Sequence, residues 1–169
     1  LNLAPSWLGS DAPLVQGYAQ TAFAQSFGED RFTWAQSYRL GLSWGLDGEP
    51  VIASERFKAG GASSLRGFGT NEVGPRGYFG EPTGGEAVVI MNQELRYHHP
   101  SGFGLVGFYD VGNVFPTVDS MRFDLRHTLG TGLRWASPVG LLRVDVGFPL
   151  DRQPEEKSYR IFFGLGQAF

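Results

Sequence analysis

The chain has 169 residues, enough for one ordinary domain, and its 25 glycines are about twice the usual share. Aromatic residues make up 14% and charged residues 18%, a composition that favours strands over helices. The formal net charge of -3 argues against a nucleic-acid-binding protein, and the lack of cysteine excludes disulfide frameworks and thiolate zinc sites. Apolar runs are far shorter than the roughly 18 residues of a membrane-spanning helix, so any membrane role must use strands.

Apolar side chains recur at every second position along most of the chain, which predicts antiparallel strands. Residues 1–5 could be the end of one strand, and the parity of residues 14–27 is ambiguous. The cleanest alternation runs from Phe32 to Leu46. Further alternating segments cover residues 87–97, 103–111, 129–135, 142–148 and 159–169. The sequence therefore predicts an all-β chain with about eight strands.

The connections between these segments alternate in length. Residues 28–31, 99–102 and 137–140 are short, whereas residues 47–85, 114–126 and 150–158 are long. Tight turns at one end and long loops at the other are typical of outer-membrane barrels. Aromatic residues near the strand ends fit the girdles of such barrels, namely Trp34, Trp44, Tyr97, Trp135 and Tyr159.

A soluble, lipocalin-like barrel with its apolar parity inward would show the same alternation. The opposite parity, however, is rich in Gly, Arg, Asp and Glu, which suits a wet barrel lumen better than a soluble surface. Phe169 also ends the chain in register with an apolar stripe. We therefore expect a transmembrane antiparallel β-barrel, with these residues facing lipid: Leu142, Val144, Val146, Phe148, Ile161, Phe163 and Leu165.

The least strand-like part of the chain, residues 55–76, contains a Gly-Gly pair, Gly60 and Gly61, followed by the triplet Arg66–Phe68. This order resembles the long sixth loop of the BamA/TamA superfamily of outer-membrane protein assembly factors, the bacterial surface antigen family. The segments GGEAVVIMNQELRY and FGLVGFYDVGNVF are similar to strands of the same family. The resemblance covers nearly the whole chain.

The resemblance implies a sixteen-stranded barrel that follows soluble periplasmic POTRA modules. We expect this chain to be the C-terminal half of such a barrel, one domain over residues 1–169 without a POTRA module. The missing half-barrel would come from N-terminal sequence or from a second copy. Because the chain opens at Leu1 without an initiator Met or a secretion segment, we expect a mature or excised piece. The expected location is the outer membrane.

By the same resemblance, residues 47–85, here called the long loop, fold back into the lumen as a plug. Arg66 is expected to contact Glu94 and Asp110, and its planar guanidinium has enough donors for both. Glu94 and Asp110 could instead be a catalytic carboxylate pair, but the many arginines of this parity make charge compensation the better interpretation.

Two neighbours of Arg66 complete the expected anchor. Gly67 would let the backbone turn close to the barrel wall. Phe68 is expected to pack against Gly130 and Gly132, where missing side chains leave space. A second expected site is the end of the chain, whose aromatic-apolar stripe resembles the C-terminal signal recognised during barrel assembly. Its residues are Tyr159, Ile161, Phe163, Leu165 and Phe169.

The function implied by the resemblance is insertion or translocation of other outer-membrane proteins. A client strand would pair with the exposed edge where the first and last barrel strands meet. The expected partners are membrane lipid and client outer-membrane proteins. A passive or structural outer-membrane barrel remains the alternative.

Enzyme chemistry finds little support in the sequence. The Gly69–Gly80 segment lacks a Walker ending, and Ser63 and Ser64 lack a nucleophile elbow. His98, His99 and His127 lack ligand spacing, so they predict turn histidines and no metal site. We expect no catalytic residue and no cofactor.

Overall fold

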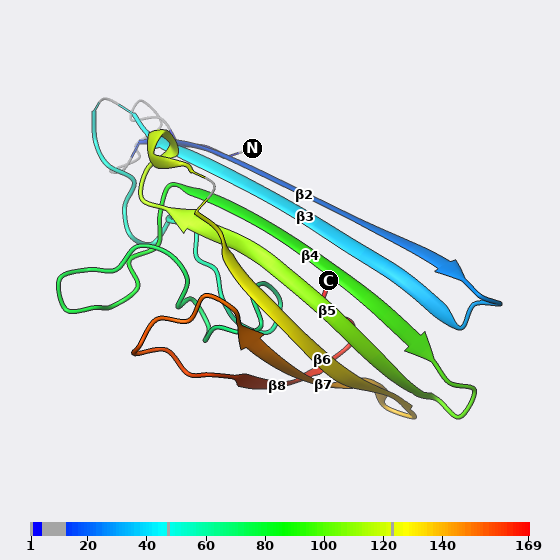
Figure 1. Cartoon of the computed structure of the whole chain (residues 1–169). Coiled ribbons are helices and arrows are strands. Elements are labelled where there is room, and N and C mark those ends of the chain that lie inside the picture. Colours follow the sequence, from blue (N-terminus) through cyan, green and yellow to red (C-terminus); the bar gives the residue numbers. More distant parts are fainter. Residues whose placement is uncertain (1, 5–12, 47, 123) are drawn as a thin grey trace.

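The computed structural model describes residues 2–4, 13–46, 48–122 and 124–169, which form one antiparallel sheet of eight strands in chain order (Figure 1). The strands are β1 (Asn2–Ala4), β2 (Leu14–Phe27), β3 (Phe32–Gly45), β4 (Ala87–His98), β5 (Phe103–Phe115), β6 (Arg126–Ser137), β7 (Gly140–Pro149) and β8 (Arg160–Leu165). The predicted strand type and number are confirmed. Within the described residues β1 and β8 do not pair with each other, so the sheet is open.

The connections follow the predicted alternation. Short turns join β2 to β3, β4 to β5 and β6 to β7 at one end of the sheet, and the longer connections gather at the other end (Figure 1). One of these carries the 3-10 turn η2 (Val118–Ser120). Among the described residues, no helix has the length and apolar character needed to cross a membrane.

The two faces of the sheet differ in what covers them. The inner face, as we call it, packs against the long loop, whereas the outer face carries exposed apolar side chains. Phe163 on β8 is 78% exposed and pairs across strands with Val144, while Val144 also pairs with the exposed Leu133. All seven side chains predicted to face lipid share this outer parity. Alternation in the sequence therefore separates the faces correctly from β3 onward.

The face of β2, ambiguous in the sequence, is fixed by its register with β3. Tyr18 lies on the inner face beside Gly41, and its ring stacks on Phe57 of the long loop at 6.3 Å. Gln16 donates a hydrogen bond from Nε2 to the Glu55 carbonyl at 2.9 Å. Small outer-face residues of β2 blur the apolar alternation there.

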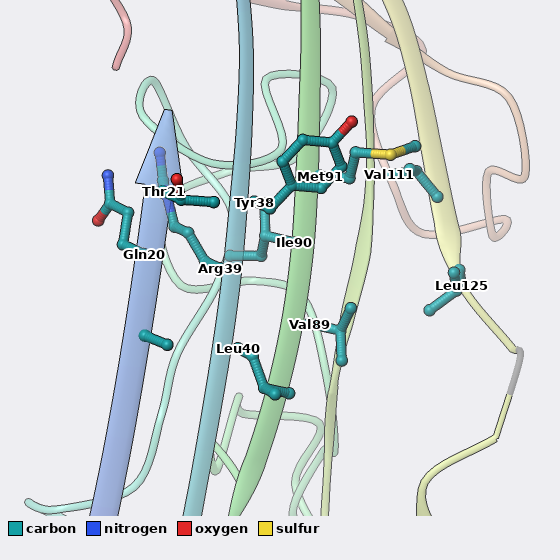
Figure 2. A pocket seen from close by; sticks show the side chains of 11 residues that line it. Gln20, Thr21, Tyr38, Arg39, Leu40, Val89, Ile90, Met91, Val111 and Leu125 are labelled. Atoms are coloured by element: carbon teal, nitrogen blue, oxygen red, sulfur yellow. The ribbon is translucent and has the colours of Figure 1, made fainter. Parts of the chain in front are cut away.

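The outer face is hollowed where β2 to β5 carry side chains of unequal size (Figure 2). A groove of about 520 Å³ lies there, with Ala19 and Thr21 on one flank and Tyr38 and Met91 among its larger lining residues. Its remaining outer-face lining is Leu40, Val89 and Val111. The groove is part of the apolar outer wall, not of the inner face.

The hydrophobic core lies between the long loop and the inner face. Leu65, Phe68 and Val73 of the loop form a buried cluster with side chains of β4 and β5. The other members of the cluster are Ala59, Val88, Ile90 and Val114, with Phe57 packed against it. Burying a side chain such as Leu65 or Phe68 contributes about 1.5–3 kcal/mol, so this core holds the loop on the sheet.

The last strand is shorter than predicted, because β8 ends at Leu165 instead of continuing to Phe169. Gly166 has a φ of 79°, a left-handed conformation that glycine adopts readily. Beyond it the chain turns, and the Phe169 ring lies 5.4 Å from the guanidinium carbon of Arg96, on the inner face. The predicted register of Phe169 with the outer apolar stripe is therefore wrong.

Candidate functional site

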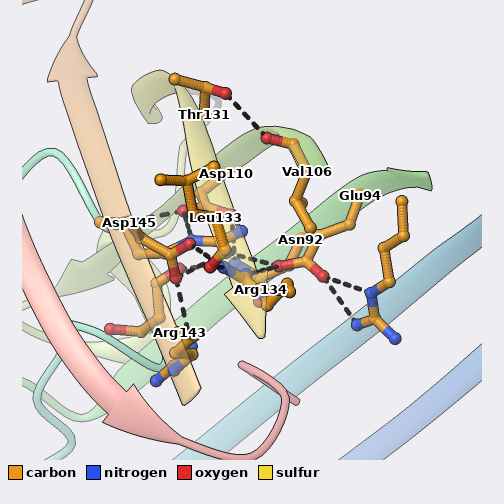
Figure 3. Close-up of polar contacts among 12 residues, drawn as sticks. Asn92, Glu94, Val106, Asp110, Thr131, Leu133, Arg134, Arg143 and Asp145 are labelled. Carbon is orange, nitrogen blue, oxygen red and sulfur yellow. Dashed lines mark hydrogen bonds and ion pairs between the residues drawn. The ribbon is translucent and has the colours of Figure 1, made fainter. Parts of the chain in front are cut away.

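A cluster of charged side chains occupies the middle of the inner face (Figure 3). Asn92, Glu94 and Arg96 are alternate residues of β4 and so share this face. Asp110 of β5 lies directly opposite Asn92 in the strand register. The long loop brings Arg66 onto these strands, where its side chain is 1% exposed.

Arg66 binds both carboxylates. Its Nε and Nη2 donate to Asp110 at 2.9 and 2.7 Å, and its backbone N–H donates to the same carboxylate at 3.1 Å. Its Nη1 donates to Glu94. The guanidinium carbon also lies 3.6 Å from the centre of the Phe108 ring, a cation–π arrangement. The structure thus brings together the three residues that the resemblance paired.

Neighbouring side chains hold the two carboxylates in place. Asn92 donates from Nδ2 to Asp110 at 2.7 Å and to the Ser64 carbonyl at 2.5 Å, which ties strand and loop together. Arg96 donates from Nε to Glu94 at 2.7 Å. Each carboxylate oxygen of the pair therefore has a donor within reach.

Burial alone would lower the pKa of Arg66, but the hydrogen bonds and negative charges of Asp110 and Glu94 outweigh it and raise the pKa above its usual value. The guanidinium therefore stays protonated across the pH range in which proteins fold.

Asp145 also belongs to the cluster, although no motif in the sequence marks it. This fully buried residue of β7 accepts from Arg134 Nη1 at 2.5 Å and from Arg143 Nη1 at 3.4 Å. Arg66 Nη1 is 3.6 Å from it. Its polar parity on β7 was the available signal, but parity alone does not show which lumen charges converge.

The predicted position is confirmed for Gly67 but not for Phe68. A Cβ on Gly67 would lie 2.8 Å from the Pro149 nitrogen, so the backbone does approach the wall closely there. Phe68 does not pack on Gly130 and Gly132, and that prediction is wrong. Phe108 fills the space beside Gly130, because the two residues are direct cross-strand partners.

The space beside Gly132 is taken by Asp145 and Arg134. Phe68 lies instead in the buried loop cluster, with the Arg126 guanidinium 4.4 Å from its ring centre.

Gly147 of β7 is the wall position that receives the loop backbone. A Cβ there would lie 2.3 Å from the Arg66 carbonyl oxygen. We expect Gly147→Ala to destabilise the protein by about 1–3 kcal/mol, the usual range for overpacking. The measurement is urea unfolding of the protein in detergent, with Gly107→Ala as control because its Cβ would meet open space on the outer face. Equal midpoints for the two variants would contradict this prediction.

The arrangement is an ion-pair cluster that fixes a loop. Among the described residues, no group of three or more His, Asp or Glu side chains is placed to hold a metal. The histidines lie apart: His98 is 3.2 Å from Thr33 Oγ1, and His127 is 2.6 Å from the Tyr109 hydroxyl.

Comparison with known proteins places this chain in a family. Residues 1–169 match the Omp85 superfamily domain. The outer membrane protein assembly factor BamA of Nitratidesulfovibrio vulgaris is 36% identical over 126 residues, which is 70% of this chain and 16% of that protein. The sorting assembly machinery 50 kDa subunit of Saccharomyces cerevisiae is 24% identical over 159 residues, covering 83% of this chain and 33% of that protein.

A solved structure shows the same fold. The crystal structure of BamA from Haemophilus ducreyi lacking POTRA domains 1–3 matches with a TM-score of 0.78 at 22% identity, covering 92% of this chain and 35% of that one. The chain thus spans a minor part of each of these relatives. The lipocalin-like alternative is excluded by this match together with the exposed apolar outer face. The chain forms the wall of an outer-membrane β-barrel and belongs to the Omp85 superfamily.

Proposed function

We propose that this chain is part of an outer-membrane protein assembly factor, which inserts or translocates other outer-membrane proteins. The observation that carries the proposal is the buried attachment of the long loop to the barrel wall through Arg66, Glu94 and Asp110. The names of the bacterial relatives support the same function.

The proposed mechanism uses the free edge of β8. This strand has six residues and pairs with β7 alone among the described strands, so its other edge offers backbone donors and acceptors. A client strand can add to such an edge through main-chain hydrogen bonds. Gly164 and Gly166 reduce side-chain packing here, which favours local opening.

The open sheet needs further strands to become a barrel. We propose that it is the C-terminal half of a sixteen-stranded barrel, completed by further sequence with POTRA modules or by a second copy. The long loop would then plug the lumen, and the outer face would contact membrane lipid. In that position the groove beside Tyr38 and Met91 fills with acyl chains (Figure 2).

Client insertion by the purified protein tests this function. The protein that carries this chain is reconstituted into lipid vesicles, and folding of an unfolded client barrel is followed by its change in gel mobility. Vesicles containing a passive barrel of similar size are the control. We expect faster client folding with this protein, whereas equal rates would favour the passive-barrel alternative.

A prediction about assembly concerns the end of the chain. We propose that the segment from Tyr159 to Phe169, including Ile161, Phe163 and Leu165, is the assembly signal. Replacing Phe169 with Ala should slow assembly in cells more than it lowers final stability, because the residue lies beyond the end of β8 and takes no part in its strand pairing. Pulse-chase measurement of the folded form checks this, with Phe79→Ala, in the long loop, as control. Unchanged assembly kinetics would rule out the signal role.

A further inference from the structure

The buried charges of the inner face do not balance. Four guanidinium groups, those of Arg66, Arg96, Arg134 and Arg143, share three carboxylates. The carboxylates are Glu94, Asp110 and Asp145. Among the described residues no further acidic side chain lies within ion-pair distance of these arginines. Arginine does not lose its proton in proteins, so the described residues of the cluster carry one surplus positive charge.

Two of these arginines face each other directly. Arg134 of β6 and Arg143 of β7 are cross-strand partners, an arrangement in which like charges destabilise a sheet. Both turn to Asp145, which is their shared carboxylate (Figure 3). The next cross-strand partners on either side of this pair are Gly104 of β5, opposite Arg134, and Gly164 of β8, opposite Arg143. Both are glycines, which leave room and supply no charge.

Arg134 also has donors left over. The residue is 5% exposed, and its Nε and Nη2 are buried without a hydrogen-bond partner in the described structure. Nη2 is 3.9 Å from Glu94, too far for a hydrogen bond. Buried donors of a charged group cost free energy when they are left unsatisfied, so an acceptor that bonds to these two atoms would stabilise the protein.

A cavity lies beside Arg134. It has a volume of about 130 Å³ and is lined by Arg96, Arg134 and Gln167, together with residues of the short turn after β4. Two guanidinium groups and an amide in this lining suit a small oxyanion, because guanidinium groups match the geometry of carboxylate and phosphate.

We propose that this cavity binds one oxyanion, a phosphate or a carboxylate, which neutralises the surplus charge between Arg96 and Arg134. The site lies at the short-turn end of the inner face and does not include the long loop. The ligand comes either from free anions or from an acidic side chain of another polypeptide. The inference goes beyond client insertion and does not depend on it.

Calorimetric titration of the protein that carries this chain, folded in nonionic detergent at low salt, tests the site. One arm uses inorganic phosphate, and the other uses a short blocked peptide with a single glutamate. Binding of phosphate identifies free anions as the source, and binding of the peptide alone identifies a polypeptide carboxylate. Binding of neither overturns the proposal.

Variants locate the site. Arg134→Gln should weaken binding about tenfold or more, since it removes charge-assisted hydrogen bonds worth over 1.4 kcal/mol. Arg39→Gln, which changes an inner-face arginine outside this cavity, should leave binding unchanged. Equal binding by both variants would overturn the assignment.

A second variant tests the anion site if Arg134→Gln does not fold. Gln167→Glu places a carboxylate at the cavity itself. It should abolish anion binding and raise the unfolding temperature measured without anion, whereas Gln153→Glu, in the loop at the opposite end of the sheet, should do neither. Retained anion binding in Gln167→Glu would overturn the proposal.

Discussion

Replacing Arg66 with alanine is expected to release the long loop from the inner face while the sheet still forms. The guanidinium is 1% exposed and bonded to two carboxylates that are themselves fully buried. Removing one partner of such a buried set costs about 3–5 kcal/mol, because the remaining charges stay in the interior uncompensated. The sheet keeps its strand-to-strand hydrogen bonds, so the loss falls on the attachment of the loop.

Most of this lost stability should come from Asp110. Without the Arg66 side chain, Glu94 keeps Arg96 and Asp145 keeps Arg134 and Arg143. Among the described contacts Asp110 keeps no cation, only two neutral donors, the amide of Asn92 and the backbone N–H of residue 66. Neutralising that carboxylate in the double variant Arg66→Ala/Asp110→Asn should therefore recover part of the stability. This rescue distinguishes a charge effect from simple loss of packing.

Protease cleavage and hydrogen exchange within the long loop measure the release. Arg66→Lys is the matched control: it keeps the charge but cannot donate to both carboxylates in the same fork geometry, so it should give intermediate protection. Unchanged protection in Arg66→Ala would show that the apolar cluster around Leu65 and Phe68 suffices to hold the loop. No rescue by Asp110→Asn would contradict the charge argument.

The faces of the sheet could be predicted from sequence because a strand exposes alternate residues to opposite sides. From Phe32 onward most large apolar side chains of each strand fall on one parity, and this parity marks the outer face. Ile90 and Phe108 are exceptions that lie buried on the inner face. The same rule gave no answer for β2, whose outer positions include Gly17, Ala19 and Thr21. Small residues make weak alternation, and only pairing with β3 decides their face.

The interior contacts could not be predicted in the same way. Parity places Gly130, Gly132 and Gly147 on the inner face, but the path of the long loop decides which of them it touches. Gly130 is covered by its own cross-strand partner Phe108, and the loop backbone instead reaches Gly147. Arg66 was predictable because a family motif carries it, whereas Asp145 lay outside any motif.

The end of the last strand depended on one residue. Alternation continues past Leu165 in the sequence, and period two carries no information about backbone handedness. The positive φ of Gly166 ends β8 and turns the chain toward Arg96. A glycine in a strand pattern signals such a break only weakly, because other strand glycines in this chain, such as Gly107 and Gly132, keep extended pairing.

Placing an arginine at Val144 is expected to destabilise the folded barrel by about 2–4 kcal/mol, the cost of a charge on the lipid face near the bilayer midplane. Val144 lies in the middle of β7 on the outer face, between Leu133 and Phe163. A guanidinium there has no lumen water or carboxylate within reach, in contrast to Arg143 and Asp145 on either side of it, whose side chains point inward.

Folding into bilayers of defined thickness measures the effect as a shift of the urea midpoint. Val144→Leu is the matched control, since it keeps the apolar surface at the same position and should shift stability by less than about 1.5 kcal/mol. The cost of the arginine should also fall when the same change is made at Leu142, closer to the turn, because the penalty depends on depth in the membrane. Equal stability of Val144→Arg and Val144→Leu would mean that lipid does not cover this part of the wall. A protein that stays monodisperse without detergent would contradict the membrane assignment of the whole outer face.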